Sequence, residues 1–292
     1  MDRLLEGRVA VVTGAGSGIG RAEAIGLAAQ GARVVVNDIG TSHDGQGVSR
    51  SPADAVVKEI NNTGGMAVSN YDSVATEKGA ENIINTAIKT YGRIDVLVNN
   101  AGVVCEPRPV FDIPLDNWEL LIKTHLFGTF YCTRYACSFM QKQRYGRIIN
   151  TSSHVGLGWK GFTAYGAAKE GIAGLTRTVA RDMAEFGVTC NAIRPLAAWR
   201  GSREITPRMA VNRPEDVASL VVFLASEKAD HINGCIFEVW HGHVGIFNEP
   251  PTVKEIIRKD GSWTAEELAD AIPRTLTRGR SREDLPPVLT PE

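Results

Sequence analysis

The sequence predicts an α/β fold: a single doubly wound parallel sheet of about seven strands, with helices on both faces. Two observations carry this prediction. Short runs of β-branched residues recur without apolar–polar alternation, which indicates strands that are buried on both faces. Longer helical patterns lie between these runs, and regular alternation of strands and helices is typical of right-handed crossovers onto one parallel sheet. The 292 residues are 43% hydrophobic and 22% charged, which is ordinary for a globular protein.

The elements can be placed in order along the chain. We expect strands at 9–13, 33–37, 66–69, 94–99, 147–151, 188–193 and 235–239. We expect helices at about 18–30, 52–62, 76–91, 116–142, 163–186 and 214–225. Asp116 and Glu119 have capping-box spacing, and Pro214 suits a first helical turn. These elements predict a Rossmann-type catalytic domain over 1–244.

A C-terminal extension, 245–292, follows this domain. Thr264 and Glu267 have the spacing of a capping box for a short helix that ends at Pro273. The extension is too short to form a second domain.

Composition excludes several classes of partner. The formal net charge is −1 and no basic stripe is present, so neither nucleic acid nor an anionic membrane is expected. No apolar run approaches the ~20 residues of a membrane span. The segment 1–7 lacks the apolar core of a secretion signal. The five cysteines are scattered without paired spacing, which fits reduced thiols in a cytoplasmic protein.

A glycine-rich turn follows the first expected strand, in Thr13-Gly-Ala-Gly-Ser-Gly-Ile-Gly20. Its glycines let the backbone turn tightly and approach a pyrophosphate at a helix N-terminus. Asp38 ends the second strand, where a carboxylate accepts hydrogen bonds from the adenosine ribose and repels a 2′-phosphate. Ser17 occupies the place where a basic residue would bind that phosphate, and Ile39 follows Asp38. The sequence therefore predicts NAD rather than NADP.

Tyr165 and Lys169 are the most informative pair of side chains. Four residues apart on a helix, they lie on the same face. A cation beside a phenol favours the tyrosinate and lowers the phenol's pKa, so the pair is a candidate general acid/base with its activator. A tyrosine and a lysine at this spacing also occur by chance in many helices.

With these features together, the chain resembles the short-chain dehydrogenase/reductase family over about residues 5–243. The match comprises Thr13–Gly20, Asp72 in Asn-Tyr-Asp-Ser-Val, Asn99-Asn-Ala-Gly102, a serine after the fifth strand, and Tyr165-x3-Lys169. The resemblance implies an NAD-dependent oxidoreductase that acts on CH–OH. It also implies a set of cofactor-binding residues: Thr13, Gly14, Ser17, Gly18, Ile19, Gly20, Asp38, Asp72, Ser73, Asn99, Ala101, Gly102, Tyr165, Lys169 and Pro195.

The resemblance also implies the catalytic residues. They are Tyr165, Lys169 and a serine whose hydroxyl holds the substrate oxygen. Alignment from the strand 147–151 selects Ser153, whereas counting back from Tyr165 selects Ser152. We favour Ser153 because strand ends fix position better than loops do. His125 stands where most members have an asparagine, and it either keeps a backbone water relay or carries a proton itself.

Within the family, the chain is most similar to the dehydrogenase part of multifunctional β-oxidation enzymes and their bacterial relatives. The similarity lies in 34–40, the long loop 40–51, 70–74 and His125-Leu126. It implies a secondary alcohol or ketone as substrate, with a 3-hydroxyacyl-CoA among the candidates. The alternative is a non-catalytic partner subunit that keeps the fold in a hetero-oligomer.

Some features depart from the family pattern or lie outside it. Leu196 follows Pro195 where glycine is usual, which predicts a different course for the next loop. His241-Gly-His243 lacks a nearby third ligand, so no metal site is expected. Aromatic residues that are candidate pocket walls are Trp159, Phe162 and Trp199, and arginines that are candidate contacts for a coenzyme A phosphate are Arg144, Arg147, Arg200 and Arg203.

The expected catalytic helix also carries small residues that permit close packing against another helix. They are Ala167, Ala168, Gly171, Ala173 and Gly174. Family members usually pair through this region, so we expect a homodimer or homotetramer.

Overall fold

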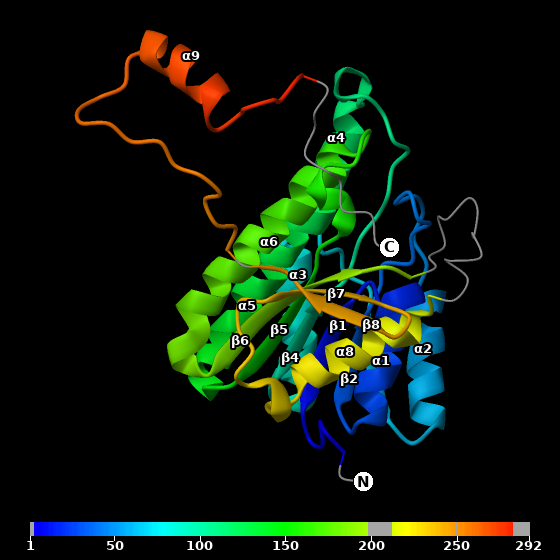
Figure 1. Cartoon of the computed structure of the whole chain (residues 1–292). Helices are drawn as coiled ribbons and strands as arrows, with labels where there is room; N and C mark the ends of the chain where they lie inside the picture. The colour runs from blue at the N-terminus through cyan, green and yellow to red at the C-terminus, as the bar shows by residue number, and fades with distance from the viewer. Residues whose placement is uncertain (1–2, 198–211, 249, 283–292) are drawn as a thin grey trace. The chain divides into compact units, whose positions relative to one another are not determined.

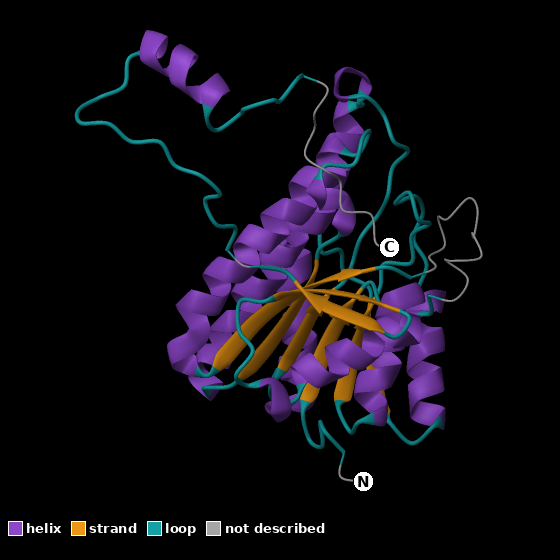
Figure 2. Cartoon of the chain, in the orientation of Figure 1, coloured by secondary structure: helices purple, strands orange, loops and turns teal. Residues whose placement is uncertain are grey.

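The computed structural model describes residues 3–197, 212–248 and 250–282. It divides into two compact units, 1–247 and 248–292. In the first unit, eight strands form one sheet in the order β3-β2-β1-β4-β5-β6-β7-β8 (Figure 2). The strands are β1 (Val9–Thr13), β2 (Arg33–Asn37), β3 (Met66–Asn70), β4 (Val96–Asn99), β5 (Gly146–Thr151), β6 (Val188–Pro195), β7 (Ile236–Trp240) and β8 (His243–Ile246).

Helices cover both faces of this sheet (Figure 1). Alternate strand residues point to opposite faces, so Ala10 and Val12 pack on one layer of helices while Val9 and Val11 pack on the other. The first layer holds α1 (Gly18–Ala29), α2 (Ser51–Asn62) and α8 (Pro214–Ala225). The second holds α3 (Glu77–Tyr91), α5 (Gly128–Gln143) and α6 (Thr163–Met183).

The predicted doubly wound sheet is confirmed, with one strand more than the expected seven or so. β1 to β7 are parallel, and β8 pairs antiparallel with the edge of β7. A two-residue turn, His241-Gly242, joins the two strands, and Gly242 takes the positive φ that such turns need. β8 is only four residues long, which is why its pattern did not stand out.

The expected helix over 116–142 is interrupted. α4 (Leu115–Leu121) passes into the π-helical turn η2 (Ile122–Phe127) before α5 begins. The predicted capping box is wrong, because α4 begins at Leu115 and has no side-chain cap. Glu119 instead pairs with Lys123 one turn later. Pro214 does open α8, as predicted.

Single-turn helices occupy the connections of the described chain. They are η1 (Val110–Asp112), η3 (His154–Leu157), η4 (Ala184–Phe186) and η5 (Glu227–Ala229). η3 follows β5 and leads into α6, so it lies at the carboxyl edge of the sheet.

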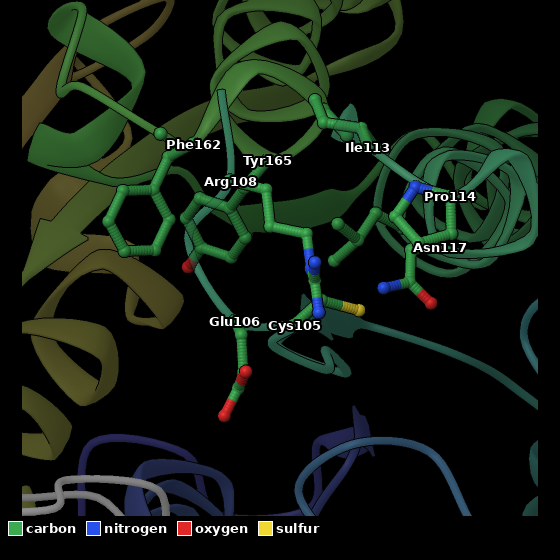
Figure 3. A pocket seen from close by; sticks show the side chains of 11 residues that line it. Cys105, Glu106, Arg108, Ile113, Pro114, Asn117, Phe162 and Tyr165 are labelled. Carbon is green, nitrogen blue, oxygen red and sulfur yellow. The ribbon is translucent and has the colours of Figure 1, made fainter. Parts of the chain in front are cut away.

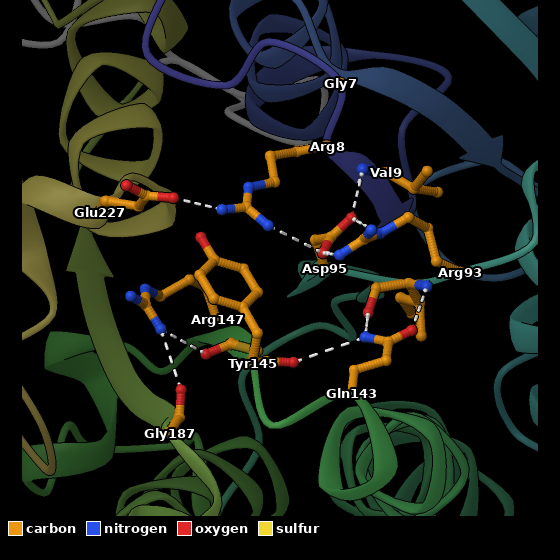
Figure 4. Close-up of polar contacts among 12 residues, drawn as sticks. Gly7, Arg8, Val9, Arg93, Asp95, Gln143, Tyr145, Arg147, Gly187 and Glu227 are labelled. Atoms are coloured by element: carbon orange, nitrogen blue, oxygen red, sulfur yellow. Dashed lines mark hydrogen bonds and ion pairs between the residues drawn. The ribbon is translucent and has the colours of Figure 1, made fainter.

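A polar cluster ties the strands together at the opposite, amino-terminal edge (Figure 4). Asp95 is fully buried and accepts hydrogen bonds from the Val9 N–H at 2.9 Å and from the Arg93 guanidinium at 2.8 and 2.6 Å. The Tyr145 ring lies between the guanidinium groups of Arg8 and Arg147, at 3.9 and 4.4 Å. This edge is filled with structural contacts, and the carboxyl edge carries the candidate site.

The second unit contains α9 (Ala265–Arg274). Its predicted capping box is present: Thr264 accepts from the Glu267 N–H at 3.2 Å, and Glu267 accepts from the Thr264 N–H at 2.7 Å. The helix continues past Pro273 and ends at Arg274, one residue later than expected. Within the described residues of both units, no helix is long and apolar enough to cross a membrane.

Candidate active site

The glycine-rich turn packs directly against the loop after β4. A side chain on Gly14 would place its Cβ 2.7 Å from the Ala101 Cα, and one on Gly20 would lie 2.4 Å from the Gly14 carbonyl oxygen. The Asn100 amide donates to the carbonyls of Thr13 and Gly14 at 2.9 and 3.1 Å. Glycine is therefore required here by the close approach of two loops.

The start of α1 is open on the side away from this contact. Gly18 has a φ of +55°, and a Cβ there would meet nothing within 4 Å. Ser17 is the N-cap residue, and its side chain makes no cap hydrogen bond. The first N–H groups of α1 thus remain available to an anion at the helix N-terminus.

Asp38 lies beside this turn, at the end of β2. Its two carboxylate oxygens accept from the Gly16 N–H at 2.7 Å and the Gly40 N–H at 2.6 Å. The side chain is buried, at 8% exposure. A negative charge is therefore fixed next to the glycine turn, as the sequence predicted. The glycine-rich turn and the Asp38 carboxylate together fit the pyrophosphate and adenosine parts of a dinucleotide.

Other predicted cofactor residues lie at the ends of neighbouring strands. The Asp72 carboxylate accepts from the amides of Asn70 and Asn82, at 2.9 and 3.0 Å. The Ser73 hydroxyl accepts from the Ala75 N–H at 3.2 Å. Asn99 is buried and donates to Thr133 and Asn150, at 3.1 and 2.9 Å. The Asp72 and Asn99 side chains thus hold the strand ends in place.

Tyr165 and Lys169 lie in the first turns of α6. The Lys169 ammonium donates to the Thr151 carbonyl at 2.7 Å and lies 5.4 Å from the centre of the Tyr165 ring. Burial lowers the pKa of Lys169 to about 7 and raises the pKa of Tyr165 to about 12. The expected lowering of the tyrosine pKa is therefore not produced by the chain alone, because desolvation of the phenol dominates.

The two candidate serines face different partners. Burial is the larger influence on Tyr165, but a hydrogen bond with the Ser153 hydroxyl opposes it and lowers the pKa of Tyr165. The same hydroxyl accepts from the Val155 N–H at 3.2 Å. The Ser152 hydroxyl instead donates to the Lys169 carbonyl at 2.9 Å. Ser153 therefore shares the site with Tyr165, and Ser152 fastens β5 to α6.

His125 lies in the π-helical turn, with its ring edge-on to Tyr165 at 5.0 Å between centroids. Its Nε2 is 2.7 Å from the Val103 carbonyl oxygen. The Val103 N–H lies 3.2 Å from the same nitrogen, and the buried Nδ1 has no hydrogen-bond partner. Burial first, and then the charge of Lys169, lower the pKa of His125 to about 3. The ring is neutral near pH 7.

A pocket that is partly open to solvent lies beside Tyr165 (Figure 3). Most of its wall comes from the segment between β4 and η2, which the sequence did not single out. The signal that could have found it is position, because a long segment directly after a parallel strand lies at the carboxyl edge. The residues that line it are Cys105, Glu106, Arg108, Ile113, Pro114, Asn117, Leu121, Gly161, Phe162, Ala164 and Tyr165.

The remaining predicted residues have mixed outcomes. Phe162 lines the pocket as expected, whereas Trp159 does not, and Trp199 lies outside the described residues. Pro195 ends β6, and the Leu196 N–H donates to the Val239 carbonyl at 3.0 Å, so the sheet pairing continues past the point where glycine is usual. Residues 198–211, where the sequence predicts a different course, lie outside the described residues.

The arginines and histidines that sequence singled out have other partners. Arg147 is buried at the amino-terminal edge and donates to backbone carbonyls, so it does not belong to the site. Arg144 donates to the Glu185 carbonyl at 2.6 Å. His241 and His243 face different carboxylates, those of Asp216 and Glu238. Arg200 and Arg203 lie outside the described residues.

Fold and site together define an oxidoreductase of the Rossmann type. The family model of the short chain dehydrogenases matches residues 8–198. The chain belongs to the short-chain dehydrogenase/reductase family, which confirms the resemblance inferred from sequence.

Relatives and solved structures agree with this assignment. The chain is 44% identical over 269 residues to peroxisomal multifunctional enzyme type 2 of Mus musculus, a match that covers 91% of this chain and 36% of that enzyme. It is 35% identical over 297 residues to hydroxyacyl-CoA dehydrogenase ChsB1 of Mycobacterium tuberculosis, covering 96% and 91%. A crystal structure of a short chain dehydrogenase from Mycobacterium avium is 41% identical, with a TM-score of 0.84, covering 95% and 97%.

Proposed function

We propose that this chain is an NAD-dependent dehydrogenase that interconverts a secondary alcohol and a ketone. The observation that carries the proposal is the pairing of Tyr165, which lines the pocket, with the buried Lys169 amine 5.4 Å from its ring, and with Ser153 just beyond the end of the neighbouring strand β5. An acid/base with a hydrogen-bonded hydroxyl on one side and a buried amine on the other suits removal of a proton from an alcohol.

The coenzyme follows from the charge next to the glycine turn. Asp38 is buried, and its carboxylate is held by the N–H groups of Gly16 and Gly40. A fixed negative charge favours two ribose hydroxyls and disfavours a 2′-phosphate. We therefore assign NAD, with Asp72, Ser73 and Asn99 to Gly102 along the adenosine side and Pro195 near the nicotinamide.

Each catalytic side chain has one task. Ser153 donates a hydrogen bond to the substrate oxygen, and Tyr165, when ionised, takes the hydroxyl proton as that oxygen becomes a carbonyl. The oxidised nicotinamide supplies the hydride acceptor and a positive charge near the phenol. Lys169 adds a second positive charge when protonated, and the two charges offset the desolvation that raises the pKa of Tyr165.

The pocket supports an acyl substrate with a polar group near the reacting carbon. Ile113, Pro114 and Leu121 offer apolar surface, and Arg108 and Asn117 offer donors. Relatives are named as a hydroxyacyl-CoA dehydrogenase and as a multifunctional enzyme. A 3-hydroxyacyl-CoA is accordingly the first substrate to test.

We also propose that the protein is a cytoplasmic homodimer or homotetramer. None of the five cysteines, all of which lie in the described residues, forms a disulfide, which suits a reducing compartment. On α6, exposed Ala167 and half-buried Gly174 leave room for a second helix, whereas Ala168, Gly171 and Ala173 pack within the chain. Light scattering of the purified chain should give a mass of two or four subunits, and a monomer at micromolar concentration would contradict this part.

The proposal is tested by an oxidation screen. Purified protein is mixed with NAD or NADP and with CoA thioesters of 3-hydroxy acids or free secondary alcohols, and reduced coenzyme is followed by its absorbance. We expect NAD-dependent turnover, and about tenfold or more preference for NAD over NADP from the Asp38 charge. No turnover of any substrate with either coenzyme would contradict the proposal.

A further inference from the structure

The turn that carries Ser153 is held from behind by polar side chains that do not line the pocket; Arg194 and His154 among them are buried, and the others are half-buried or exposed. They come from five elements: the turn's own η3 and four elements that follow it in sequence. The members of this group, which we call the rear clamp, are His154 in η3, Glu170 in α6, Arg194 in β6, Glu238 in β7 and His243 in β8.

Arg194 is the centre of the rear clamp. It is only 2% exposed, and its Nη1 donates to the Ser153 carbonyl at 2.7 Å. The same nitrogen lies 2.7 Å from the Glu170 carboxylate. The guanidinium carbon lies 4.9 Å from the centre of the Phe247 ring, which covers it. One buried cation thus joins the serine turn to the helix α6.

The turn itself rests on α6 at the same place. A Cβ on Gly156 would lie 2.7 Å from the Glu170 carboxylate and 3.3 Å from the Lys169 Cβ. Glu170 follows Lys169 directly in the helix that also carries Tyr165. Arg194 therefore fixes the spacing between the backbone of Ser153 and the helix that supplies the acid/base pair.

A second tie holds the next residue of the turn. Arg194 and Glu238 are register partners on β6 and β7. Glu238 accepts hydrogen bonds through its two oxygens, from His154 at 2.9 Å and from His243 at 2.8 Å. The His243 ring stacks on Trp240 at 3.8 Å. These contacts do not pass through Arg194.

We propose that Arg194 is a positioning residue, which aims the Ser153 hydroxyl at Tyr165 and the substrate oxygen by holding the Ser153 carbonyl against α6. The proposal rests on the proposed function of Ser153. Because the serine side chain is short, the position of its backbone sets the position of its hydroxyl. Displacement of a reacting group by about 1 Å lowers the rate about a hundredfold. Charge-assisted hydrogen bonds from a planar guanidinium suit this task better than a lysine does.

The test compares Arg194→Lys and Arg194→Ala with a matched control, Arg147→Lys. Arg147 is also a buried arginine that donates to backbone carbonyls, on the neighbouring strand β5 at the opposite edge of the sheet. We measure kcat, KM for the alcohol and the dissociation constant of NAD. Hydrogen exchange of peptides that cover 152–158 reports the Val155 N–H, which donates to Ser153.

In Arg194→Lys and Arg194→Ala, kcat is expected to fall about tenfold to hundredfold, with NAD binding unchanged. Exchange over 152–158 should accelerate, and added guanidinium ion should restore part of kcat in Arg194→Ala. Arg147→Lys should keep kcat within about twofold and show no rescue. If Arg194 had only a structural role, variants at Arg194 and Arg147 would lose thermal stability to a similar extent, and guanidinium ion would not restore kcat.

An unchanged kcat and unchanged exchange over 152–158 in Arg194→Ala would overturn the proposal. If the wild-type chain oxidises no alcohol, the proposed function fails by itself. The exchange measurement still tests the clamp in that case, because it needs no substrate.

Discussion

Ser152 and Ser153 are adjacent in sequence, but their side chains face different partners. The Ser153 hydroxyl opposes the rise in the pKa of Tyr165 that burial causes, and the Ser152 hydroxyl donates to the Lys169 carbonyl. Strand-end alignment selected Ser153 from sequence, whereas counting back from Tyr165 selected its neighbour. The two ways of counting disagree because the difference between adjacent serines is which way each hydroxyl points across to α6.

Alanine variants of the two serines should therefore differ in kind. Ser153→Ala removes a donor to the developing charge, so kcat should fall about a hundredfold or more. Ser152→Ala should lower the melting temperature and leave kcat within a few fold, since it loses only a structural hydrogen bond. Steady-state kinetics and thermal melts check both. A larger fall of kcat in Ser152→Ala would reverse the assignment.

His125 is expected to act through position and not by carrying a proton. Burial lowers its pKa to about 3, so the ring is neutral near pH 7. His125→Asn should then leave the pH dependence of kcat unchanged. The loss of an ionisation from the pH–rate profile of this variant would show that His125 titrates during turnover.

Helix α1 contains a buried carboxyl group. Glu23 lies among its buried residues, and neither of its carboxylate oxygens has a partner. Burial raises the pKa of Glu23 from 4.5 to about 8. The carboxyl is therefore mostly protonated at neutral pH, and folding becomes less favourable as the pH rises from about 4.5 to about 8.

Glu23→Gln should remove this dependence. Because the folded pKa is raised, the wild type is most stable, relative to the variant, below the unfolded pKa and loses that advantage as the pH rises, by on the order of a few kcal/mol in all. Denaturant unfolding of both chains at about pH 6 and about pH 8.5 should show a gap that grows in favour of Glu23→Gln. A gap independent of pH would mean that Glu23 is ionised in the folded chain.

Elements with strong local patterns were predicted well, and those that depend on distant contacts were not. Residues 33–37 are three valines between Arg33 and Asn37, and this pattern predicts a strand without reference to any distant contact. β8 exists only because β7 lies beside it, and the π-helical turn around His125 is a change in backbone geometry within one continuous helical pattern. The Arg194 contact with Ser153 joins residues 41 apart in sequence.

The complete first unit brings the site together by topology. Parallel strands place their carboxyl ends at one edge, so the glycine turn after β1, Asp38 after β2 and Ser153 after β5 meet there. α6 then adds Tyr165 and Lys169 to the same edge. This arrangement makes Tyr165 the group on which every other assignment depends.

The most direct test of that claim is the turnover of Tyr165→Phe with NAD and an alcohol that the wild type oxidises. We predict that kcat falls about a thousandfold or more, while NAD binds as tightly as in the wild type and the melting temperature is retained. A variant that keeps more than about a tenth of the wild-type kcat would contradict the assignment of Tyr165 as the acid/base.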